Sequence, residues 1–192
     1  MRKDGSAFRY VEILSLAILH SALMLFYIGA VAYGAWSDAR SLRIPNELSL
    51  ALLVAFVPTA LLAGLPLEII AWHLGVAVAV LAVGFALFAF GLFGGGDAKL
   101  LAACALWVGY DQLFWFLAAV ALVGGVLSIL VILLRKGLGL WPNWLVHSAK
   151  GLFEKNKSIP YGIAIAVGAL AVLPRMRLFP AMWHDIFALI VG

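Results

Sequence analysis

Asp38 and Asp97 are the acidic residues whose positions in this sequence could support catalysis. Asp38 follows a long apolar stretch, and Asp97 directly precedes another one. An ionisable side chain at membrane depth is costly and is therefore a candidate for function. If the two carboxyl groups meet, the proximity of like charges would force them to share one proton. The alternative for either residue alone is that it only marks a helix end facing water.

The composition excludes an ordinary soluble domain. Of the 192 residues, 66% are hydrophobic and 11% are charged, whereas soluble domains have roughly 45–50% apolar and about 25% charged residues. The formal net charge is +4. In so apolar a chain this charge indicates loops that contact anionic lipid, and it gives no support for nucleic acid binding.

The apolar stretches predict an all-α polytopic membrane protein, a bundle of about six transmembrane helices. The expected spans are residues 12–36, 47–65, 68–92, 98–110, 112–134 and 159–174, followed by an interfacial or re-entrant C-terminal segment, Leu178 to Val191. We expect residues 1–192 to form a single integral-membrane domain without a separate soluble domain. The longest stretch outside the spans, Arg135 to Lys157, contains aromatic residues suited to the membrane surface.

The fourth span is unusually short. Its uncharged part, Leu100 to Tyr110, would rise only about 16 Å as a helix, roughly half the thickness of the hydrocarbon core. We therefore expect the polar residues at its start, Asp97 included, to lie below the lipid headgroups.

The distribution of Lys and Arg favours an N-terminus outside the cell and both aspartates at the cytoplasmic face. The loops expected outside, near residues 65–68 and 110–112, contain no basic residue, although the outer termini would contain several. The inner loops would contain Arg40, Arg43, Lys99, Arg135, Lys136, Lys150, Lys155 and Lys157.

Each aspartate lies beside residues that favour a helix boundary. Gly94, Gly95 and Gly96 precede Asp97 and allow close approach of another chain, such as an extended peptide. Because a helix N-terminus favours negative charge and a C-terminus disfavours it, we expect Asp97 to be the ionised partner and Asp38 the protonated one.

Three further short segments have structural interpretations. Pro45 and Asn46 suit a helix start with Asn46 as the N-cap, and Pro160 and Tyr161 suit another. The Lys99 side chain is expected to reach the headgroups.

Neither a metal site nor a Ser/His/Asp arrangement is expected. Cys104 is the only cysteine, which leaves no intramolecular disulfide or multi-cysteine zinc site. No histidine is paired at helical spacing with another histidine or a carboxylate; the four are His20, His73, His147 and His184.

The combination of these motifs resembles the type IV prepilin peptidases, a family of GxGD intramembrane aspartyl proteases. The matching segments are Asp38 followed by Ile44-Pro45-Asn46, the run Gly94-Gly95-Gly96-Asp97-Ala98-Lys99, and Pro160-Tyr161-Gly162. The chain is similar to the short, Flp/Tad-pilus type. Longer members have paired CxxC motifs and also methylate the new N-terminus, an activity that we do not expect here.

The resemblance implies cleavage of the leader from prepilin or pseudopilin substrates at the bacterial inner membrane, without metal or cofactor. Asp38 and Asp97 would be catalytic, and the substrate would contact Gly94, Gly95, Gly96, Lys99, Pro45, Asn46, Pro160 and Tyr161. The alternatives are another GxGD protease, of the preflagellin or signal-peptide type, and a small transporter or assembly factor without enzymatic activity. A proton-coupled transporter would more naturally have an acidic residue in the middle of a span, and the uncharged stretches contain none.

Overall fold

The computed structural model describes residues 4–136 and 159–179, and within these ranges all regular structure is helical. This confirms the predicted all-α membrane fold. The elements are α1 (Asp4–Ser41), α2 (Asn46–Leu62), α3 (Leu67–Ala89), α4 (Gly95–Val108), α5 (Leu113–Lys136), α8 (Tyr161–Val172) and the 3-10 helix η1 (Leu173–Arg175).

Each of the six expected spans coincides with one helix. Among the described residues, three segments are long and apolar enough to cross a membrane: Leu14–Ser41, Leu67–Ala89 and Leu113–Leu134. The helix α4 has 14 residues, or about 21 Å, and is as short as the sequence indicates. Most of the expected surface segment Arg135 to Lys157, and the C-terminal segment beyond residue 179, lie outside the described residues.

The first helix ends later than predicted. The apolar pattern stops at residue 36, but α1 continues to Ser41, and Asp38 lies near the C-terminal end of this helix, as expected. The hydroxyl of Ser41 donates to the carbonyl of Ser37 (2.8 Å), and the N–H of Leu42 donates to the carbonyl of Asp38 (2.8 Å). These hydrogen bonds extend the helix through polar residues, which a hydropathy pattern does not detect.

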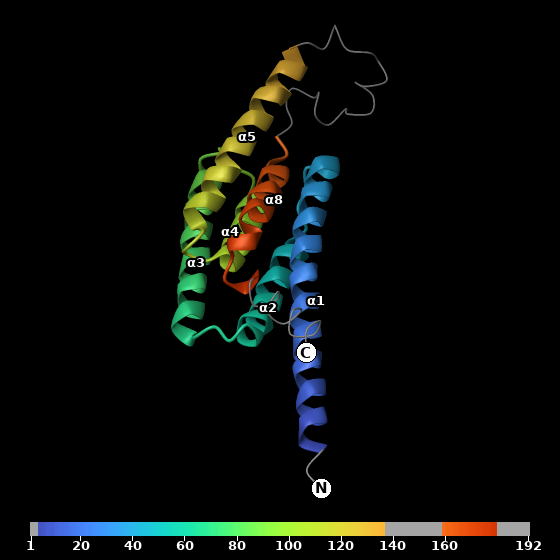
Figure 1. The fold of residues 1–192 in the computed structure, drawn as a ribbon. Helices are drawn as coiled ribbons and strands as arrows, with labels where there is room; N and C mark the ends of the chain where they lie inside the picture. The colour runs from blue at the N-terminus through green and yellow to red at the C-terminus, as the bar shows by residue number, and fades with distance from the viewer. Residues whose placement is uncertain (1–3, 137–158, 180–192) are drawn as a thin grey trace.

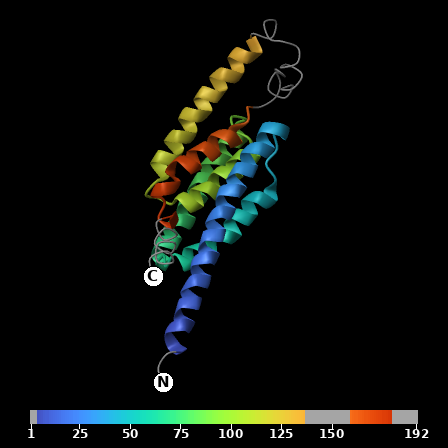
Figure 2. The ribbon, with the colours of Figure 1, turned by 45° about the vertical axis from the view of Figure 1, so that its right-hand side comes forward.

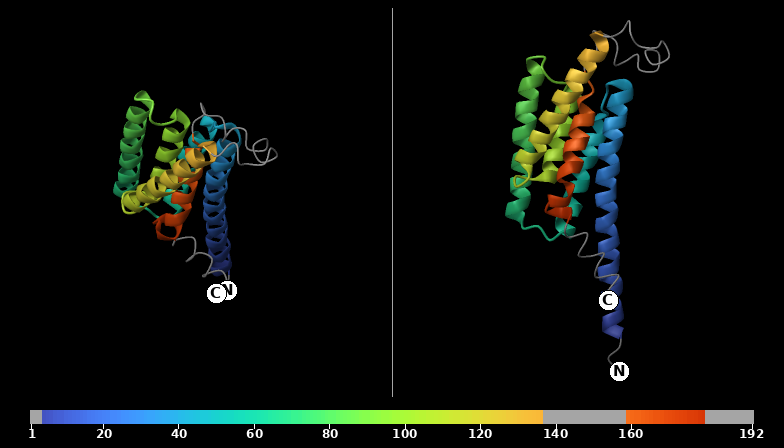
Figure 3. Two further views of the ribbon diagram at one scale, coloured as in Figure 1. Left: turned by 90° about the horizontal axis from the view of Figure 1, so that it is seen from above. Right: turned by 45° about the horizontal axis from the view of Figure 1, so that its top comes forward.

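The short helix α4 lies at the centre of the bundle. It packs against α2, α3, α5 and α8, while α8 also packs between α1 and α5. Figures 1 and 2 show α8 between α1 and α5, and Figure 3 shows that the first turns of α1 extend beyond the other helices. Helices that follow one another along the described chain run in opposite directions, so the end of α1 and the starts of α4 and α8 lie at the same end of the bundle (Figure 1).

An aromatic cluster fixes α4 against α1 and α2. Trp107 is fully buried, and its indole N–H donates to the carbonyl of Leu52 at 2.9 Å. Its ring stacks on Tyr27 with centroids 4.6 Å apart and meets the edge of Phe56 at 6.1 Å. Because the only polar group of the indole has a partner, this large side chain is buried without an unsatisfied donor.

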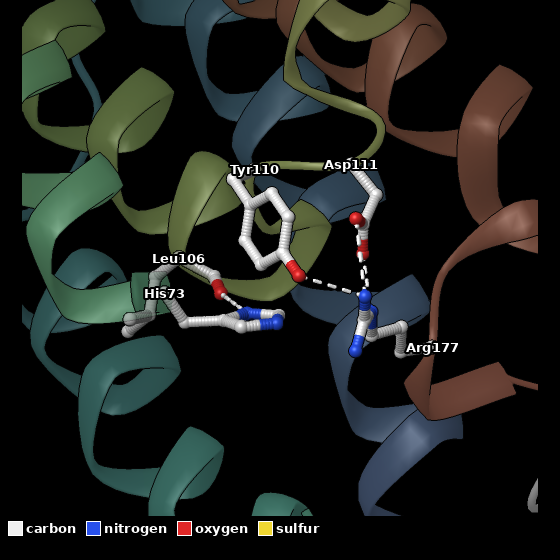
Figure 4. Close-up of polar contacts among 5 residues, drawn as sticks. All are labelled: His73, Leu106, Tyr110, Asp111 and Arg177. Carbon is white, nitrogen blue, oxygen red and sulfur yellow. Dashed lines mark hydrogen bonds and ion pairs between the residues drawn. The ribbon is translucent and has the colours of Figure 1, made fainter. Parts of the chain in front are cut away.

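A polar cluster connects the other end of the bundle to the segment after η1 (Figure 4). Arg177 forms an ion pair with Asp111 and donates to the hydroxyl of Tyr110 at 2.8 Å. Nearby, Nδ1 of His73 donates to the carbonyl of Leu106 at 2.7 Å. The ion pair is partly exposed and contributes little stability by itself, but it fixes the position of the chain that follows α8.

Close contact between α3 and α4 yields a test of the packing. A Cβ atom at Gly84 would lie 3.0 Å from Cβ of Ala98, whereas one at Gly75 of the same helix would meet nothing within 4 Å. We expect Gly84→Leu to lower stability by about 1–3 kcal/mol through overpacking, and Gly75→Leu to leave it unchanged. Thermal unfolding in detergent can be followed by thiol labelling of Cys104, which is buried and free. Equal unfolding temperatures for the two variants would contradict the contact.

Candidate functional site

A cavity of about 300 Å³ opens where α1 ends and α4 begins. Both aspartates line it, although they are 59 positions apart in the sequence. The remaining lining residues are Leu42, Arg43, Ile44, Asn46, Gly94, Gly95 and Gly96. The structure therefore brings together the two predicted aspartates, the three glycines and Asn46, while Pro45, Lys99, Pro160 and Tyr161 lie outside the lining.

Asp38 is held by the first turn of α8. Its side chain is buried, and Oδ2 accepts the backbone N–H of Gly162 at 2.7 Å. This N–H lies in the first turn of the helix and has no acceptor within it. A Cβ atom at Gly162 would lie 2.8 Å from Cβ and 2.9 Å from Oδ2 of Asp38. Glycine is therefore required here by the close approach of the carboxyl group.

Asp97 is held by the start of its own helix. It is the third residue of α4, its side chain is buried, and its carboxylate accepts a hydrogen bond from the backbone of Gly94, the N-cap. This contact is the half of a capping box in which the third residue reaches back to the cap. A Cβ atom at Gly94 would overlap Oδ2 of Asp97, so this glycine leaves space for the carboxylate.

The environment of Asp97 favours its protonated form. Asp97 precedes the apolar part of α4 and lies outside the three long spans. Burial, and then the negative charge of Asp38, raise its pKa to about 7, against the opposing effect of the hydrogen bond from Gly94. This pKa does not support the expectation that Asp97 is the ionised partner, because burial and the second carboxylate outweigh the helix terminus.

The loop between α1 and α2 closes one side of the cavity. The hydroxyl of Ser37 donates to the carbonyl of Arg43 at 2.8 Å, and Leu42 adopts a φ of 53°, a conformation that non-glycine residues seldom take. Ile44 packs on Gly96: a Cβ atom added at Gly96 would lie 3.3 Å from the Cβ atom of Ile44. Because Gly96 has no side chain, the loop that follows Asp38 can pack against the start of α4. This contact places Asp38 and Asp97 beside the same cavity.

The residues around Asn46 differ from the sequence expectation. Pro45 occupies the N-cap position of α2 and makes no side-chain cap, so Asn46 is the first helical residue and not the cap. Its Oδ1 instead accepts a hydrogen bond from Nζ of Lys99 at 2.8 Å. Lys99 is exposed, and this bond joins the starts of α2 and α4 beside the cavity.

Tyr161 is directed toward α5. Its hydroxyl lies 3.2 Å from Oγ of Ser128, and its ring meets the edge of Phe93 at 5.5 Å. Pro160 is the N-cap residue of α8. The cavity-facing contact comes instead from the backbone of Gly162, which sequence reasoning did not single out. A helix start beginning Pro-Tyr-Gly was the available signal, since its first N–H groups are free to bind a carboxylate.

This arrangement can carry out acid–base chemistry with water. Two buried carboxyl groups line one cavity, and the charge of one acts on the other. Such a pair retains one proton near neutral pH, so that it offers a base and an acid together. Within the described ranges, no three His, Cys, Asp or Glu side chains gather to hold a metal ion.

Comparison with known proteins identifies the family. The model of the type IV leader peptidase family matches residues 25–129, more than half of the chain and including both aspartates. Neither the curated proteins nor the solved structures contain a match. The chain belongs to the type IV leader peptidase family.

Proposed function

We propose that this protein is a membrane-embedded aspartyl endopeptidase that cleaves the leader from type IV prepilin-like proteins. The observation that supports this most strongly is the shared cavity of Asp38 and Asp97, two carboxyl groups from different helices with an electrostatic effect of one on the other. The family assignment supports a leader peptidase, and this cavity supplies the chemistry that such an enzyme needs.

The proposed mechanism uses the two carboxyl groups in different protonation states. Asp38, held by the N–H of Gly162, takes a proton from water as the oxygen attacks the scissile carbonyl carbon. Asp97, with its pKa near 7, donates a hydrogen bond to the carbonyl oxygen and stabilises the tetrahedral intermediate. Breaking of the C–N bond, with proton transfer to the leaving nitrogen, releases the leader carboxylate and a new N-terminal amine. No cofactor takes part.

The substrate would enter as an extended chain along the loop residues. Gly94, Gly95 and Gly96 line the cavity without side chains, so their backbone groups are accessible to a peptide backbone. Asn46, the first residue of α2, also lines this cavity. Tyr161 and Pro160 act in this proposal by holding the first turn of α8, because neither lines the cavity.

The cavity is proposed to face the cytoplasm of a bacterial cell. Arg40, Arg43 and Lys99 lie at this end of the bundle, on the last turn of α1, the following loop and the first turn of α4. The turn between α2 and α3 at the opposite end contains no basic residue. Basic residues gather on the cytoplasmic side of inner-membrane proteins, where a prepilin leader would also lie.

Loss of either carboxyl group tests the mechanism. We expect Asp38→Asn and Asp97→Asn each to lower prepilin cleavage by at least about 100-fold, the scale of one acid–base group. Co-expression with a type IV prepilin and gel mobility of the product measure this, with membrane accumulation of each variant as the control. A chelator should leave the wild-type rate unchanged. Continued processing by either variant would refute the pair mechanism.

Gly162 offers a test of the geometry around Asp38. Because an added methyl group would lie within 3 Å of the Asp38 side chain, Gly162→Ala should displace the carboxyl group and reduce kcat by about 100-fold. The control is Gly125→Ala on α5, where a Cβ atom would meet nothing within 4 Å. Wild-type kcat in Gly162→Ala would show that the contact with Asp38 does not position it for catalysis.

The raised pKa of Asp97 predicts the pH dependence. The folded protein keeps this proton until the pH approaches about 7. Above that pH both carboxyl groups become ionised, and the acid that polarises the carbonyl group is lost. We therefore expect kcat/KM for prepilin in proteoliposomes to fall as the pH rises through about 7. A rate that stays constant from about pH 6 to about pH 9 would contradict this assignment.

A further inference from the structure

A second cavity, of about 470 Å³, lies beside the carboxylate cavity. It runs between α2 and α3, with α4 as its floor, and we call it the lateral groove. Its walls include Leu50 and Leu53 of α2 and Val78 and Leu81 of α3, and Leu106 lies on its floor. The helices α2 and α3 are consecutive in the chain, and both pack on α4, so the groove is a space between two helices that share one support.

The lateral groove is open on the side that faces lipid. Leu50 is 61% exposed and Val78 is 66% exposed, although both are large apolar side chains. The whole of α3, Leu67–Ala89, is long and apolar enough to cross a membrane. A partner that enters this groove must therefore be apolar and must approach from within the bilayer.

One end of the lateral groove is polar and is joined to the carboxylate cavity. Asn46 lines both spaces, and its hydrogen bond with Lys99, a second groove residue, marks the junction. Glu47 also lies at this end. Along α4 the groove extends from Lys99 to Leu106, which is about 10 Å or two helical turns.

This distribution fits a chain that is extended at one end and helical at the other. A peptide bond can be cleaved only where the helix is unwound, and unwound backbone groups need hydrogen-bond partners that lipid does not supply. The polar side chains at the junction could bind those groups. Below the junction the partner is surrounded by apolar side chains, where a helix satisfies its own backbone.

We propose that the lateral groove binds the apolar transmembrane helix of the substrate, next to the bond that is cleaved. The inference rests on the proposed function, because it is the carboxylate cavity that makes the junction a cleavage point. The groove would fix the depth of the substrate helix, so that the residues leaving it past Asn46 reach Asp38 and Asp97. Recognition would then depend on an apolar helix as well as on the leader.

Filling the groove tests the proposal with a matched pair of variants. Ala77 lines the groove, whereas Ala79 on the same helix is exposed outside it. Two probes are compared in proteoliposomes: a full-length type IV prepilin, and a peptide that spans its cleavage site but lacks the apolar helix. We expect Ala77→Trp to lower kcat/KM for the prepilin by at least about tenfold, mainly through KM, and to leave cleavage of the peptide within about twofold. Ala79→Trp should change neither rate.

The outcomes separate this proposal from the proposed function. If the wild-type protein cleaves neither probe, the peptidase assignment itself fails. If it cleaves both and Ala77→Trp cleaves the prepilin normally, or loses both activities equally, the groove does not bind the helix.

Cysteine crosslinking provides a second measurement, in the Asp97→Asn background. A Val78→Cys variant should crosslink to a cysteine in the apolar helix of the prepilin, and Val83→Cys, exposed on the same helix outside the groove, should not. Crosslinks only between two copies of the peptidase, or none at all, would assign the groove to self-association or to lipid and overturn the proposal.

Discussion

Two carboxyl groups buried at one end of a helical bundle impose the main constraint on this structure. Each needs a hydrogen-bond donor where water is scarce, and each obtains one from backbone at the start of a helix. Asp38 accepts the N–H of Gly162, and Asp97 accepts a hydrogen bond from Gly94. Both donors are glycines because the carboxyl groups occupy the space of a side chain. The positions of α4 and α8 thus follow from the needs of the acidic pair.

The rest of the bundle holds these two helix starts in register. Trp107 anchors α4 through its hydrogen bond to Leu52. At the start of α8, Tyr161 contacts Ser128 on α5, and beyond its other end Arg177 pairs with Asp111. Because α8 is fixed at both ends, the N–H of Gly162 has a defined position relative to Asp38. The apolar core therefore contributes to the site by limiting how far two short helices can shift.

The sequence predicts the helices well because uncharged stretches in a membrane protein have few other interpretations. It also predicts the aspartates, since Gly94 to Asp97 and the residues after Asp38 form a family motif. It ends the first span at residue 36, however, because hydropathy does not register the hydrogen bonds of Ser41 and Leu42 that extend α1 beyond Asp38. The roles of Gly162 and Asn46 depend on contacts between distant segments, to Asp38 and Lys99, which no local pattern contains.

If Asp38 and Asp97 act as one titrating pair, the protonation of Asp97 must depend on the charge of Asp38. Infrared spectroscopy of the purified protein in lipid can follow the carboxyl absorption of Asp97 against pH, assigned by its loss in Asp97→Asn. In the wild type the midpoint should lie near the pKa of about 7 that burial and Asp38 produce. In Asp38→Asn we expect a lower midpoint, because the neighbouring charge is gone while burial remains. An unchanged midpoint in Asp38→Asn would show that the two groups titrate independently and would rule out a coupled pair.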